Sequence, residues 1–75
     1  GILSVDAEGN FYIGDKIRSL EEVKAAISSS IRANPELRVQ VRADQNTEYE
    51  SVRKLLKTAA EAGAYEIIYA TYESR

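Results

Sequence analysis

The stretch LRVQVRADQNTEY, residues 37–49, decides the fold expected for this chain. Its first half alternates apolar and polar side chains, and on an extended strand this period places one set on a single face: Leu37, Val39, Val41 and Ala43. Thr47 then stands three residues before Glu50, which is the spacing of a helix capping box. A half-buried strand that leads into a helix is therefore predicted here.

The residues before this stretch predict a hairpin and a first helix. Residues 2–5 and 11–13 are apolar runs on either side of a Gly-Asn turn, the pattern of a β-hairpin. After a second turn at residues 14–15, Ile17 is expected to pack beside the cap of the next helix. Ser19 and Glu22 form a second capping box, and a proline at residue 35 ends the helix near Asn34.

The residues after this stretch predict a second helix and a last strand. The helix is expected over residues 48–62, and Gly63 is expected to end it. Tyr49, in its first turn, is expected to be a core residue. Residues 65–72, YEIIYATY, are rich in β-branched and aromatic types and favour a strand. Its inward face stays open at this point, because two sets compete: Ile67, Tyr69 and Thr71 against Ile68, Ala70 and Tyr72.

The element order β-β-α-β-α-β predicts an α+β fold. Right-handed crossovers with both helices on one face give a four-stranded mixed sheet of order 2-1-3-4, with the last strand at an edge. The other face would then carry Arg38, Gln40, Arg42 and Tyr12 without a helix over it. The edge strand is uncharged after Glu66, which favours pairing with another strand, most simply in a homodimer. The alternative is that the charged tail, residues 73–75, shields this edge.

Composition argues against most catalytic chemistry. The 75 residues include no histidine and no cysteine, which removes the commonest general base, thiolate nucleophiles and the usual metal ligands. The acids near the hairpin turns do not match a calcium loop. The net charge of −2 gives no electrostatic case for nucleic acid. We therefore expect no catalytic residue, metal site or cofactor.

The remaining candidates are contact residues, each with a plainer alternative. Asp44 is either a partner or cell-wall contact or a cap of its own loop. Arg38 and Arg42 are either solvated or the anchors of an interface, where arginine and tyrosine are enriched. The candidate interface residues are Arg38, Arg42, Asp44, Tyr49, Ile67, Tyr69 and Thr71.

Several segments together resemble one known family. They are SVDAEGNFYIGD at residues 4–15, VRAD at residues 41–44 followed by Tyr49 and Val52, and AGAYEI at residues 62–67. Their order and spacing are similar to those of the periplasmic domain of the ExbD/TolR biopolymer-transport family, over about residues 2–71. Gln45 departs from the lysine expected in that family after the aspartate. The aromatic last strand is a second departure.

The resemblance implies a non-enzymatic part of an energy-transduction complex driven by the proton motive force in a bacterial inner membrane. Partners would be a second copy, an ExbB/TolQ-type channel protein, a TonB/TolA-type protein and, for the TolR branch, peptidoglycan. Residues 1–75 would be one periplasmic domain, separated from a single transmembrane helix. The alternative from a different class is a small soluble ligand-binding regulatory domain that uses the uncovered sheet face.

Overall fold

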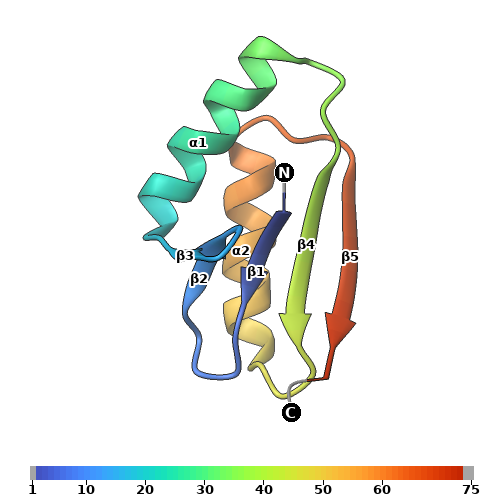
Figure 1. Ribbon diagram of the computed structural model, residues 1–75. Helices are drawn as coiled ribbons and strands as arrows, with labels where there is room; N and C mark the ends of the chain where they lie inside the picture. Colours follow the sequence, from blue (N-terminus) through green and yellow to red (C-terminus); the bar gives the residue numbers. More distant parts are fainter. Residues whose placement is uncertain (1, 74–75) are drawn as a thin grey trace.

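A computed structural model describes residues 2–73 of the chain (Figure 1). Its strands form one mixed sheet of order β3-β2-β1-β4-β5, and two helices pack against it. Along the chain the elements are β1 (Ile2–Val5), β2 (Phe11–Ile13), β3 (Lys16–Ile17), α1 (Leu20–Ala33), β4 (Val39–Asp44), α2 (Tyr49–Glu61) and β5 (Ile67–Tyr72).

The α+β class with two helices and a mixed sheet is as expected, but the four-stranded sheet of order 2-1-3-4 is not confirmed. The sheet has a fifth strand, because Lys16 pairs with Ile13 and Ile17 with Tyr12 on the outer side of β2. Ile17 is 59% exposed, so its expected packing beside the helix cap was wrong. A strand of two residues is too short to show a period of two, and this explains why the pattern did not reveal it.

The register fixes which residues share a face of the sheet. β1 and β5 both run parallel to β4, while β2 is antiparallel to β1. Leu3 pairs with Val41, and Val41 pairs with Tyr69. Directly paired residues project to the same side of a sheet, so these three side chains lie on one face.

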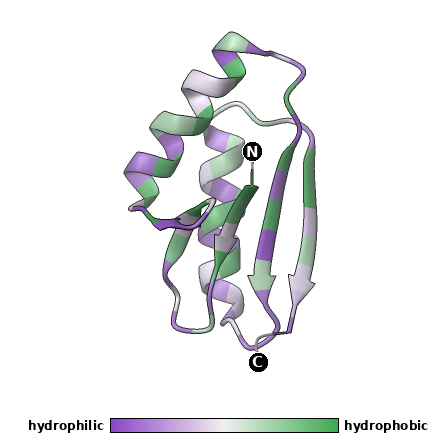
Figure 2. Cartoon of the chain, in the orientation of Figure 1, coloured by the Kyte–Doolittle hydropathy of each residue, from purple (hydrophilic) through white to green (hydrophobic). Residues whose placement is uncertain are grey.

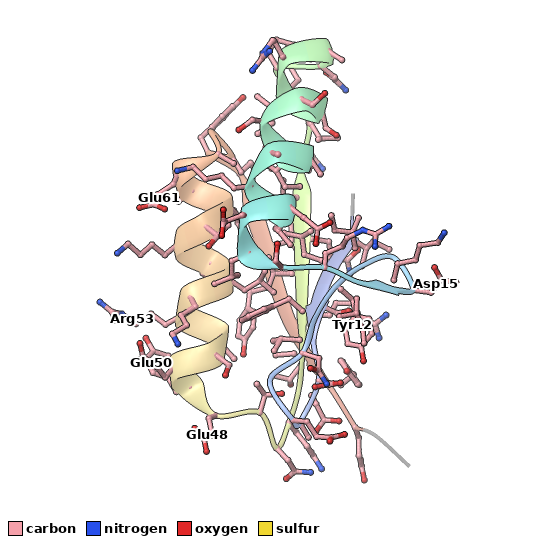
Figure 3. The ribbon with its side chains drawn as sticks, turned by 90° about the vertical axis from the view of Figure 1, so that its left-hand side faces the viewer. Tyr12, Asp15, Glu48, Glu50, Arg53 and Glu61 are labelled. Carbon is pink, nitrogen blue, oxygen red and sulfur yellow. The ribbon has the colours of Figure 1, made fainter. Side chains whose placement is uncertain are left out.

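Both helices cover that same face, as Figures 1 and 3 show together. Val23 and Ile27 from α1 and Leu55 from α2 lie in one buried cluster with the apolar residues of β1 and β4. The alternation predicted for residues 37–43 is confirmed within β4, where Val39 and Val41 are buried. Figure 2 shows the same alternation as green and purple segments along β4.

The two helix starts differ from each other. At α1 the capping box is confirmed: the Glu22 N–H donates to Ser19 Oγ at 3.1 Å, and the Ser19 N–H donates to Glu22 Oε1 at 2.9 Å. At α2 the capping box was wrong, since Glu48 is the N-cap and makes no side-chain cap bond. The Thr47 hydroxyl instead donates to the Asp6 carbonyl oxygen at 2.9 Å, which ties the β4–α2 loop to the end of β1.

Candidate functional site

In the part of the chain that the structure describes, no strand lies beside the backbone groups on the outer edge of β5. The Val39 N–H donates to the Glu66 carbonyl (3.1 Å) and the Gln45 N–H to the Tyr72 carbonyl (2.8 Å). In a parallel ladder the residues that bond one neighbour alternate with residues whose groups point the other way. The backbone N–H and C=O groups of the even-numbered residues of β5 therefore point toward β4. The N–H and C=O groups that point outward, which we call the free edge, belong to Ile67, Tyr69 and Thr71.

The register also decides the question of the inward face. Ile67, Tyr69 and Thr71 pair with Val39, Val41 and Ala43, so their side chains lie on the helix-covered side. Only Ile67 packs against the core, and Tyr69 remains 48% exposed because β5 lies beyond the reach of the helices. Figure 2 shows no strongly hydrophilic segment along β5. The strand thus offers unpaired backbone and partly apolar side chains together.

Among residues 2–73, no helix lies over the opposite side of the sheet. Pairing across the five strands places one set of side chains there, which we call the open face: Ile2, Ser4, Tyr12, Ile17, Gln40, Arg42, Asp44, Ile68, Ala70 and Tyr72. The set mixes small, aliphatic, aromatic and cationic side chains. Ile68 is 47% exposed and lies beside the free edge.

Of the two candidate arginines, Arg42 contacts β5 and Arg38 contacts the residue directly before it. The Arg42 guanidinium carbon lies 5.2 Å from the centre of the Tyr72 ring, within cation–π range. Arg38 Nε lies 3.2 Å from Glu66 Oε1, and both side chains are largely exposed. Burial raises the pKa of Tyr72 above its ordinary value, and the nearby carboxylates of Asp44 and Asp6 raise it further.

Asp6, at the end of β1, organises the hairpin turn. Its carboxylate accepts bonds from the backbone N–H groups of Glu8 and Asn10, from the Asn10 amide and from the Tyr12 hydroxyl, at 2.8–3.2 Å. Burial opposes ionisation, but these four bonds together lower the pKa of Asp6 below its ordinary value. The same contact raises the pKa of Tyr12. These bonds use the carboxylate within the turn.

Asp44 lies at the end of β4 and is 3% exposed. Its Oδ1 accepts the Asn46 N–H at 2.8 Å, and its carbonyl accepts the Thr47 N–H at 2.9 Å. This is the geometry of a residue that caps its own loop. A contact between Asp44 and a partner stays a prediction. In the structure the Asp44 side chain is buried.

Tyr49 is 75% exposed, so the expectation that it belongs to the core was wrong. The buried stripe of α2 is centred on Leu55, and Tyr49 lies six residues earlier, about 120° away around the helix. On the outer side of α2, Arg53 and Glu50 form an ion pair of 3.5 Å. Figure 3 shows these two side chains and Glu61 projecting from α2, on the opposite side of the molecule from Tyr12.

Residues 2–73 show neither a pocket nor a metal-ligand cluster. No pocket opens among them, and no three acidic side chains gather as metal ligands would. Neither α1 nor α2 has the length and apolar character that a membrane-spanning helix requires. What these residues do present is a free strand edge beside an open sheet face.

The sequence pointed to part of this surface and missed the rest. Strand pairing and the ion pair bring six of the seven predicted contact residues to β5 or beside it: Arg38, Arg42, Asp44, Ile67, Tyr69 and Thr71. Tyr49 lies elsewhere, at the start of α2. Ile68, Tyr72 and the Asp6–Tyr12 pair were not singled out, because their roles follow from pairing between strands that are distant in sequence. For the Asp6–Tyr12 pair, the one local signal was the short distance in sequence between Asp6 and Asn10, which is typical of a turn.

Comparisons with known proteins identify the family of this chain. A family model described as "Biopolymer transport protein ExbD/TolR" matches residues 2–74. Proteins named "Biopolymer transport protein ExbD" from Neisseria gonorrhoeae and from Neisseria meningitidis serogroup C are 33% identical to the chain over 72 residues, covering 92% of the chain and 50% of each relative. The chain thus spans about half the length of the curated relatives it matches. This chain belongs to the ExbD/TolR biopolymer transport family.

Proposed function

We propose that this chain is a non-enzymatic periplasmic domain of an inner-membrane energy-transduction complex of the Ton or Tol-Pal type, driven by the proton motive force. Its task is to dimerise and to contact partners. The partners are an ExbB/TolQ-type channel protein and a TonB/TolA-type protein. Family membership supports the setting, and the free edge of β5 is the observation that supports the mode of contact.

The free edge suits pairing because it lacks the usual protection of an edge strand. Exposed edges are normally short, charged, bulged or covered, whereas β5 has six residues without a charge or proline. Addition of a strand gives binding through backbone hydrogen bonds and gives selectivity through alternate side chains. A second copy of the chain supplies such a strand without any other component.

A contact with peptidoglycan is the second part of the proposal, and it belongs on the open face. Tyr12 and Tyr72 offer ring surface there, while Gln40 and Arg42 offer hydrogen-bond donors. Binding of the chain to purified cell-wall sacculi should fall in the variant Arg42→Ala and persist in Arg53→Ala, which changes the outer side of α2. Equal binding by the two variants would exclude this face.

The proposed dimer is tested by sedimentation of the chain over a range of concentrations. We expect a monomer–dimer equilibrium that Tyr69→Asp shifts to monomer while circular dichroism and melting temperature remain close to the original. Ile17→Asp is the matched control, because it places the same charge at the opposite edge of the sheet. A chain that is monomeric up to millimolar concentration would exclude self-pairing.

The proposed location needs the natural full-length protein. Fractionation of source cells should place it in the inner membrane, with an intact mass above that of this chain by about 5 to 7 kDa for one spanning helix and its flanks. A soluble native protein would instead favour the regulatory-domain alternative.

A further inference from the structure

We infer that the Thr47 hydroxyl is a latch with two positions. In the state described, it holds the β4–α2 loop to the turn between β1 and β2, and in a second state it caps α2 instead. The latch is independent of the proposed dimer and of the proposed cell-wall contact. Thr47 and Glu50 have the spacing of a capping box, yet no side chain caps α2. Two uses therefore compete for one hydroxyl.

In the first position the hydroxyl is bonded to the end of β1. Thr47 Oγ1 donates to the Asp6 carbonyl oxygen at 2.9 Å and lies 3.4 Å from the Val5 carbonyl oxygen. The Asp6 carbonyl also accepts the Gly9 N–H at 3.0 Å, and the Asp6 carboxylate is held by its four hydrogen bonds within the turn. The first position therefore depends on the order of the turn between β1 and β2.

The start of α2 is suited to the second position. Glu48 is the N-cap residue, and its ψ of 138° is extended. Rotation of this torsion angle into the helical range, taken up by the loop residues before it, makes Glu48 the first helical residue and Thr47 the N-cap. Thr47 Oγ1 then accepts the Glu50 N–H. Glu48 is exposed and stands at the start of α2 (Figure 3), so the rotation buries no charge, and a carboxylate in the first turn is favoured by the helix dipole.

The two positions are close in free energy, because each supplies one hydrogen bond of the hydroxyl. A hydroxyl–carbonyl bond and a helix cap make contributions of overlapping size. Loss of order in the turn between β1 and β2 weakens the first position alone. The Tyr12 hydroxyl donates to the Asp6 carboxylate at 2.8 Å from the open face. The latch thus couples contacts made at Tyr12 to the first turn of α2, where the exposed Tyr49 lies.

Amide exchange and chemical shifts measured by NMR test the latch. Asp6→Ala removes the carboxylate bonds that order the turn, so the Thr47 hydroxyl should move to the cap. Exchange of the Glu50 N–H should then slow by about fivefold, the factor that a typical cap gives, and the Glu48 Cα shift should move toward helical values. Thr47→Asp accepts a cap bond but donates none, and should give both changes with the turn intact. Asp15→Ala, in the turn between β2 and β3, is the matched control and should give neither.

The sign of the change separates a latch from an ordinary structural contact. Slower exchange at Glu50 in both Asp6→Ala and Thr47→Asp supports the latch. Faster exchange in Asp6→Ala, with Glu48 still extended, would mean that the bond only holds the loop in place. Unchanged exchange in Thr47→Asp would mean that α2 does not accept the cap, and this result is decisive even where Asp6→Ala fails to fold. The double variant Asp6→Ala/Thr47→Val has no hydroxyl, so slowing that persists there would overturn the role of Thr47.

Discussion

The two edges of the sheet differ in length and charge. β5 ends one side with six uncharged residues, Ile67–Tyr72. β3 ends the other side with two residues, Lys16–Ile17, and Asp15 and Arg18 stand on either side of it. Short edges with charged side chains resist pairing, whereas long uncharged ones invite it. The comparison predicts that the proposed association of this domain is directed to one side of the sheet, which favours a closed pair over a chain of copies.

Proline substitutions on adjacent residues of β5 should show the largest effect. Ala70→Pro removes an N–H that bonds β4 and leaves a carbonyl without its donor, so the free energy of unfolding should fall by about 1–3 kcal/mol. Thr71→Pro removes only an outward N–H, and the monomer should keep its stability while dimerisation weakens. Chemical denaturation and sedimentation of both variants measure the two quantities separately. Equal destabilisation would show that the outward assignment is wrong.

Giving β5 the kind of charge that stands at β3 should convert the free edge into a protected one. Tyr69→Lys would place a like charge on the free edge of each copy of the proposed dimer and remove the half-exposed ring. We expect the dimer dissociation constant to rise at least about tenfold, which corresponds to about 1.4 kcal/mol. Ile17→Lys at the other edge should leave the constant unchanged. If both variants weaken the dimer equally, the two edges are not functionally different.

The hairpin that carries β3 should depend on the ionised Asp6 carboxylate. Asp6→Asn should lower the free energy of unfolding at pH 7 by about 1 kcal/mol through weaker turn hydrogen bonds. The folded pKa of Asp6 is lowered, so its contribution is present above the unfolded value of about 3.9 and is lost as the pH falls through the folded pKa. Denaturation at pH 7 and pH 2.5 should therefore show a difference between variant and original that shrinks in acid. A difference independent of pH would assign the effect to packing.

Local patterns predicted the interior of the fold better than its edges. The alternation in β4 and the Ser19–Glu22 capping box depend on neighbours in sequence, so both were readable. Thr47 was misread because its hydroxyl bonds a carbonyl that lies 41 residues away in sequence. The orientation of β5 could not be predicted because both of its sides are apolar. Only its register with β4 decides which side faces the helices.

The Arg38–Glu66 ion pair at the start of β5 should contribute least. Its two side chains are 69% and 47% exposed, so water screens the attraction, and Arg38→Ala should cost only about 0.2–1 kcal/mol. The value should fall further at high salt. The proposed dimer would sharpen the comparison between the edges, because Glu66 lies directly before the free edge. Denaturation should then show a larger cost of Arg38→Ala at concentrations where the chain is dimeric. A cost that does not change with concentration would separate this ion pair from the interface and leave the hydrogen bonds of the free edge as the source of association.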